Sequence, residues 1–237
     1  MNTHTMPVER SGRAEHVDHA ASHAMAPVAQ PQRTPRHADA TLRQETARLG
    51  MWVFLAGEVL FFGVLFVAYG VARWHSPAGF AAASAHTQLA IGTANTAVLL
   101  TSSLTMALAA EAARDGQRRG VARWLWVACA LGALFMLLKG VEYTLEWRDE
   151  LFPGPGFSLH DSGAELFFTW YFVVTALHAL HLAIGMALAA VFAVASRRRA
   201  SQIAGAPRVH SLALYWHFVD IVWLVLYPLI YLVAPRS

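Results

Sequence analysis

The chain has 237 residues, of which 56% are hydrophobic and only 14% are charged. Soluble domains carry about a quarter charged residues, so this composition indicates a protein that lies in lipid. The net charge of +3 does not indicate a nucleic-acid-binding protein, because the sequence has no basic face interleaved with aromatic residues. The one cysteine, Cys129, excludes an intramolecular disulfide.

Residues 1–47 form the first predicted region, a polar tail. They are rich in Ala, His, Pro, Arg and Gln and contain no apolar core of a signal peptide. Such a segment buries too little surface to offset its ordering entropy, which predicts a disordered tail. Its histidines could bind a metal, but their irregular spacing is weak evidence for a site. They are His4, His16, His19, His23 and His37.

Five apolar stretches follow within a predicted membrane domain of residues 48–237. They cover approximately residues 50–72, 89–112, 121–143, 164–195 and 212–233. Each is near or above the roughly 20 residues that a helix needs to cross a bilayer. Breakers and charges separate them, including a Pro-Gly-Pro-Gly segment and a run of three arginines. The sequence therefore predicts an all-α fold, a bundle of five transmembrane helices with a disordered cytoplasmic tail.

The arginines predict the orientation of this bundle. Fourteen of the seventeen lie in the tail up to Arg48, in the segment 114–123 or in the segment 197–208. The opposite side has only Arg73, Arg148 and Arg236. Because cytoplasmic loops carry the excess of basic residues, we expect a cytoplasmic N-terminus and an external C-terminus.

The first apolar stretch contains a carboxyl group, Glu58, about 12 Å from its cytoplasmic start. Ionisable side chains in hydrocarbon are costly, so each needs a partner or a function. Two interpretations stay open. Glu58 is either a glutamic acid hydrogen-bonded to a neighbouring helix or a carboxyl that exchanges protons with its surroundings.

Polar residues of the next two stretches predict contacts within the bundle. Asn95 shares a helix face with small and hydroxylated residues, a pattern typical of a close helix–helix seam. Lys139 and Glu142 have the i, i+3 spacing of an ion pair at a helix end. We expect this pair, with Glu146 nearby, to reach water at the outer membrane border.

Three histidines and an aspartate in the last two stretches raise the question of a metal or haem. They are His178, His181, His217 and Asp220. Imidazole is a common ligand, but His178 and His181 are offset on the helix, and hydrogen bonding between helices is favoured. A quinone pocket fits these residues no better. We predict that they form a buried polar network with Asn95, without a metal site or a catalytic residue.

Five segments, one in each predicted helix, resemble subunit III of haem–copper oxidases. They are Trp52–Glu58 with Phe61 and Phe62, Asn95–Ser103, Lys139–Tyr143, Thr175–Gly185 with Phe167 and Phe168, and Tyr215–Leu224. The resemblance covers residues 49–233 and leaves the tail outside it. It implies a non-catalytic subunit of a bacterial terminal oxidase of the cytochrome c oxidase type, located in the inner membrane.

The resemblance also implies partners and roles. Haem and copper belong to subunit I and its partner subunits, with subunit II also expected in the complex, and this chain carries bound phospholipid but no cofactor of its own. The family supports proton uptake and the stability of the catalytic subunit. Glu58 matches the family's buried carboxyl, whereas His178, His181, His217 and Asp220 match positions that are not metal ligands.

The sequence leaves several alternatives to this interpretation open. Many family members have seven helices, and five-helix forms also occur in quinol oxidases and in subunits associated with nitric oxide reductases. A proton-coupled transporter would need an inverted repeat and broken helices, which the sequence does not show. Neither the electron donor nor the acceptor of the complex follows from this chain, and nucleic acid is not an expected partner.

Overall fold

The computed structural model describes residues 35–154, 156–198 and 205–232, which form helices and their short connections. The helices are α1 (Pro35–His75), α2 (Pro77–Ala85), α3 (Leu89–Arg114), α4 (Arg118–Arg148), α5 (Ser162–Arg197) and α6 (Ala206–Tyr231). All except α2 are long and apolar enough to cross a membrane. The predicted all-α fold with five membrane-spanning helices is confirmed.

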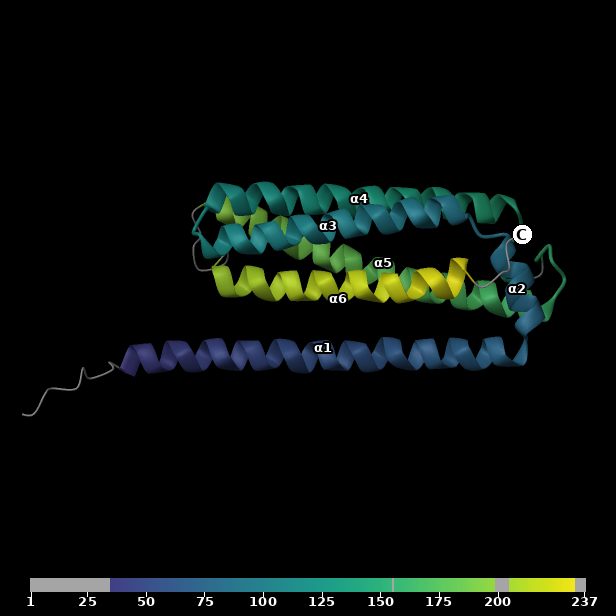
Figure 1. Cartoon of the computed structure of the whole chain (residues 1–237), viewed down its shortest axis with the longest axis horizontal. Helices are drawn as coiled ribbons and strands as arrows, with labels where there is room; N and C mark the ends of the chain where they lie inside the picture. The colour runs from purple at the N-terminus through teal and green to yellow at the C-terminus, as the bar shows by residue number, and fades with distance from the viewer. Residues whose placement is uncertain (1–34, 155, 199–204, 233–237) are drawn as a thin grey trace, which may run out of the picture.

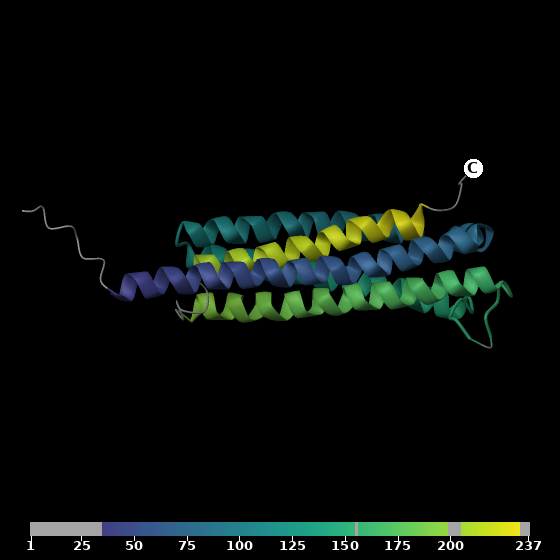
Figure 2. The same ribbon diagram turned by 90° about the horizontal axis from the view of Figure 1, so that it is seen from below.

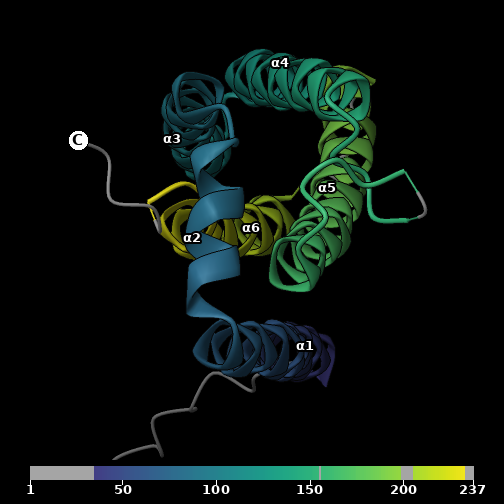
Figure 3. The ribbon, with the colours of Figure 1, turned by 90° about the vertical axis from the view of Figure 1, so that its right-hand side faces the viewer.

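Four of the long helices form a ring, and the fifth lies outside it. In the ring, α3, α4, α5 and α6 surround a core of side chains, while α1 lies against α5 and α6 (Figures 1 and 3). We compared an apolar stretch of 18 residues in each long helix. In α1 only 11% of this stretch is buried, compared with 33% to 50% in the other four helices. The outer helix is therefore loosely packed, and most of its surface is available to lipid or to another chain.

The start of α1 differs from the prediction. The helix begins at Pro35 rather than near residue 50, so residues 35–47 are helical and not part of a disordered tail. Residues 38–48 consist mostly of Ala, Leu, Gln, Glu, Arg and Thr without Gly or Pro, so nothing stops the membrane helix from continuing. Figures 1 and 2 show this end of α1 extending past the other helices. The rest of the predicted tail, residues 1–34, lies outside the described residues.

The remaining spans also continue beyond their apolar stretches at one end or both, because polar residues at a membrane border can stay helical, whereas α6 ends at Tyr231, before the predicted end at residue 233. The prediction of residues 121–143, for example, corresponds to α4 at Arg118–Arg148. Asp161 caps the start of α5, where its Oδ1 accepts hydrogen bonds from the backbone N–H groups of Gly163 at 2.7 Å and Ala164 at 3.3 Å.

The short helix α2 was not predicted, and it joins α1 to the ring. It crosses the end of the bundle between α1 and α3 (Figure 3), and we call this the α2 end. Phe80 is fully buried there, with its ring 5.5 Å from that of Phe167 and 5.4 Å from that of Tyr69. Apolar periodicity could not reveal α2, because nine residues of mostly alanine lack a distinct polar face.

Hydroxyl groups of α1 and α2 bind the last carbonyls of α6, which have no partner within their own helix. The Tyr69 hydroxyl donates to the carbonyl of Leu229. The Ser84 hydroxyl donates to the carbonyl of Ile230 at 2.8 Å. The outer helix is therefore fastened to the ring mainly at the α2 end.

Close contact between α2 and α5 leads to a first prediction. A Cβ atom at Gly79 would lie 2.8 Å from the backbone of Gly163, which cannot move aside as a side chain could. We expect Gly79→Ala to lower the free energy of unfolding by about 1–3 kcal/mol through overpacking. Thermal unfolding of the purified protein in one detergent measures the effect. Gly140→Ala is the matched control, because nothing lies within 4 Å of a Cβ there, and equal stability of both variants would contradict the prediction.

Candidate functional site

The carboxyl group of the first span pairs with a histidine of α5. Glu58 Oε2 lies 3.1 Å from His181 Nε2, and both side chains are mostly buried, with 20% and 14% of their surface exposed. These two residues, the Glu58–His181 pair, provide a direct polar contact between the loosely packed α1 and the ring.

Neighbouring groups fix the orientation of His181. Its Nδ1 lies 2.8 Å from the carbonyl oxygen of Leu177, one turn earlier on α5. The Tyr215 hydroxyl of α6 donates to the His181 carbonyl at 2.9 Å. The ring of Phe62 meets the imidazole edge to face, with centroids 5.1 Å apart. The imidazole is therefore held by α1 and α5, while α6 binds the backbone of the same residue.

The hydrogen-bond partners of His181 indicate which atoms of the Glu58–His181 pair must carry a hydrogen. A carbonyl oxygen only accepts, so Nδ1 of His181 carries a hydrogen and donates it to Leu177. A neutral ring then has no hydrogen on Nε2, and the contact with Glu58 requires one further proton, either on the carboxyl or on the ring.

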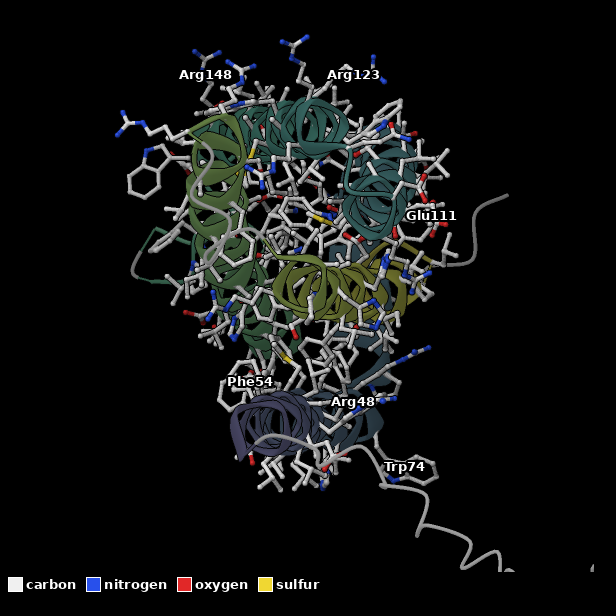
Figure 4. The ribbon with its side chains drawn as sticks, turned by 90° about the vertical axis from the view of Figure 1, so that its left-hand side faces the viewer. Arg48, Phe54, Trp74, Glu111, Arg123 and Arg148 are labelled. Atoms are coloured by element: carbon white, nitrogen blue, oxygen red, sulfur yellow. The ribbon has the colours of Figure 1, made fainter. Side chains whose placement is uncertain are left out.

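A groove between α1 and the α5–α6 side of the ring runs past this pair. Its inner part is a cavity of about 460 Å³. Apolar side chains form most of the lining, and Glu58, His181 and Tyr215 add polar groups to it. A second cavity of about 760 Å³ continues toward the end opposite α2, where Arg48 and Arg208 contribute to the lining. Figure 4 shows Phe54 and Arg48 on the side of α1 that faces the ring, whereas Trp74 points away from it.

The interior of the ring contains several of the polar groups that we predicted to form a buried network. His178 is buried between the rings of Phe135 and Trp223, at centroid distances of 5.6 and 5.1 Å. The side-chain N and O atoms of Asn95, His178 and Asp220 have no hydrogen bond of ordinary geometry within the described part of the chain. The Ser103 hydroxyl interacts with Asp220, and the buried polar network stays a prediction.

The other predicted residues lie in separate places. His217 Nδ1 is 2.7 Å from the Ser103 hydroxyl, at the contact of α6 with α3. Lys139 Nζ is 2.9 Å from Glu142 Oε2 at the α2 end of the ring. The expectation that this ion pair reaches water is wrong, because Lys139 is 4% and Glu142 0% exposed. The surrounding helices α5 and α6 cover it.

Comparison with known proteins places this arrangement in a family. A family model described as cytochrome c oxidase subunit III matches residues 32–234. The chain belongs to the cytochrome c oxidase subunit III family. The cytochrome c oxidase subunit 3 of Thermostichus vulcanus is 31% identical over 96% of this chain and 97% of its own length. That of Alkalihalophilus pseudofirmus is 30% identical over 84% and 93%. The cytochrome bo(3) ubiquinol oxidase subunit 3 of Pseudomonas putida is 29% identical over 78% and 85%.

As a subunit III, the chain is a multi-pass membrane protein that forms one part of a larger oxidase complex. Across the described ranges of this subunit, no group of three or more His, Cys, Asp or Glu side chains is arranged to hold a metal. The Glu58–His181 pair brings a carboxyl group and an imidazole into direct contact beside the groove.

Sequence reasoning missed several functional contacts of this subunit III. Tyr171 and Tyr231 had no predicted role, although both hydroxyls accept hydrogen bonds from Lys139. Tyr215 was not expected to hold His181. A usable signal existed in the first case, because a buried ammonium has three hydrogens and one carboxylate cannot satisfy them all.

Proposed function

We propose that this subunit III is the non-catalytic subunit of a bacterial terminal oxidase of the cytochrome c oxidase type. It supports proton uptake and the durability of the catalytic subunit through the Glu58–His181 pair and a lipid bound beside it. The observation that carries this proposal is the pair itself, a carboxyl group in contact with an imidazole on the wall of an apolar groove. The groove gives a carboxyl group within the membrane access to a ligand or to water.

A phospholipid is the ligand that fits the groove. The part around Phe54 and Leu188 is apolar and suits an acyl chain. Arg48 and Arg208 lie at the end opposite α2, where a phosphate group would meet two guanidinium groups. The arrangement of apolar and cationic parts matches the amphiphilic shape of a membrane lipid.

The proposal also includes the orientation of the chain in the membrane and its partner subunits. The arginine distribution supports a cytoplasmic N-terminus and an external C-terminus in the inner membrane. Haem and copper belong to subunit I and its partners, with which this chain assembles together with subunit II. The resemblance to a ubiquinol oxidase subunit of Pseudomonas putida supports quinol as the alternative electron donor of the complex.

Affinity purification from the native membrane in mild detergent tests the proposal. We expect a haem–copper subunit I and phospholipid to co-purify, as detected by mass spectrometry, with all visible absorbance on the partner subunits. A copper-containing subunit II in the preparation would indicate cytochrome c as the donor, and its absence would favour quinol. A colourless chain without partners would contradict the proposal.

Replacing Glu58 by glutamine separates the proton role from the structural one. The amide can donate a hydrogen bond to His181 Nε2, so we expect normal assembly and a stability loss of about 1 kcal/mol or less. The carboxyl group is lost, and proton uptake and the lifetime of activity during turnover should decrease. Glu165→Gln on α5, with an intermediate side-chain exposure, is the matched control. Unchanged proton uptake and unchanged lifetime in Glu58→Gln would refute the proton role.

A further inference from the structure

A second group of ionisable side chains lies at the α2 end of the ring, apart from the groove. It consists of Lys139, Glu142 and Glu146 of α4, Tyr171 of α5 and Tyr231 of α6, which we call the lysine cluster. Their exposed fractions are 4%, 0%, 2%, 1% and 0%. One lysine and two glutamates are therefore enclosed together, and any charge that they carry must be balanced inside the protein.

The ammonium group of Lys139 is fully hydrogen-bonded. It donates to Glu142 Oε2 at 2.9 Å, to Tyr171 Oη at 2.8 Å and to Tyr231 Oη at 2.9 Å. An ammonium has three hydrogens, so none remains for another carboxylate.

Glu142 has the contacts of an ionised carboxylate. One oxygen accepts from Lys139, and the other accepts from the Tyr231 hydroxyl at 2.6 Å. Both oxygens therefore act as acceptors, and one of the donors is a cation. This arrangement makes Glu142 the counterion of Lys139.

Glu146 lies one turn further along the same helix and has no such contacts. Neither of its oxygens has a partner among the described residues within ordinary hydrogen-bond distance and angle limits, although the Tyr171 hydroxyl is close enough to interact with the carboxyl group. The charged groups near it are Lys139, Glu142 and Asp149, and the Tyr171 and Tyr143 hydroxyls also face it. Lys139 is already paired, and both other charged groups are acidic.

A second buried negative charge at this position would therefore be uncompensated. Burying an unpaired carboxylate costs far more free energy than burying a neutral carboxylic acid. We propose that Glu146 binds a proton and stays a neutral carboxylic acid, so that this subunit has a proton-binding site at the α2 end in addition to the Glu58–His181 pair. This inference does not depend on the proposed role of Glu58.

Charge-neutral substitutions of the two glutamates test the assignment. Glu146→Gln replaces one neutral group by another of similar shape, so the yield of subunit III bound to the purified complex should stay within about twofold of the unmodified protein. Glu142→Gln leaves Lys139 without its counterion, and this yield should fall about tenfold or more. The double variant Lys139→Gln, Glu142→Gln removes both charges and should recover most of the loss.

Infrared spectroscopy of the same complexes gives a direct readout. Neutral carboxylic acids have a carbonyl stretch separate from that of carboxylates, and the band of an exchangeable carboxyl shifts in D₂O. We expect Glu146→Gln to remove one such band. An unchanged band, or a loss of bound subunit as large as in Glu142→Gln, would show that Glu146 is ionised and would overturn the proposal. If the unmodified chain did not bind a haem–copper complex, the proposed function would fail instead, and the infrared test would still apply to the isolated protein.

Discussion

Replacing Lys139 by methionine is expected to destabilise the ring by about 3–5 kcal/mol. The methionine side chain is unbranched and fills much of the same space, so the change mainly removes the charge and three hydrogen bonds. Glu142, which is fully buried, then lacks the cation that compensates it. Thermal dissociation of subunit III from the purified complex measures the effect as a lower transition temperature.

A second substitution distinguishes lost charge balance from poor packing. When Lys139→Met is combined with Glu142→Gln, no uncompensated charge remains, and we expect most of the stability to return. A double variant as unstable as the single one would show that the shape of the lysine side chain matters more than its charge. Unchanged stability of Lys139→Met alone would contradict the assignment of Glu142 as its counterion.

The spans could be predicted from the sequence because their signal is local. About 20 apolar residues in a row determine a membrane helix without knowledge of its neighbours. The start of α1 at Pro35 was missed, since polar residues such as those at 38–48 are compatible with either a tail or a helix. Only continuity with the apolar part of α1 decides between the two.

The residues of the candidate site could be predicted from the sequence, but their contacts with one another could not. Glu58 stands out because a carboxyl group within an apolar stretch is rare. Its partner could have been any of the three histidines, since sequence spacing within α5 and α6 does not reveal which face meets α1. The structure selects His181 and places His178 inside the ring instead. Pairings of this kind depend on the packing of whole helices, which no single segment encodes.

The same argument explains why burial of Lys139 was unexpected. At a helix end, a lysine usually extends its long side chain toward water. Here two tyrosines from different helices, Tyr171 and Tyr231, lie over it and supply hydroxyl acceptors. Their sequence separation from Lys139 is 32 and 92 residues, so the enclosing contacts are a property of the tertiary fold.

Replacing Trp216 is expected to have a large effect on the stability of the ring core. It is 1% exposed, and its ring edge lies against α5 where a Cβ at Gly185 would be only 3.3 Å away. Its indole N–H donates to the Ser102 hydroxyl of α3 at 3.1 Å. Within a bilayer, helix association depends on such packing and hydrogen bonds, since lipid tails are as apolar as the core. We expect Trp216→Ala to cost about 3–5 kcal/mol, mainly through the cavity it leaves.

Trp216→Phe is the matched comparison for this position. Phenylalanine keeps part of the ring in contact with Gly185 but loses the hydrogen bond to Ser102, so the cost should lie below that of alanine and include about 1 kcal/mol for the lost bond. Thermal dissociation of subunit III from the complex ranks the variants. Equal losses for Trp216→Phe and Trp216→Ala would mean that the bond to Ser102, rather than the volume of the indole, holds α6 against α3. In that case the hydrogen bond to Ser102 on α3, and not the packing of the indole against Gly185 on α5, would mainly determine how α6 closes the ring.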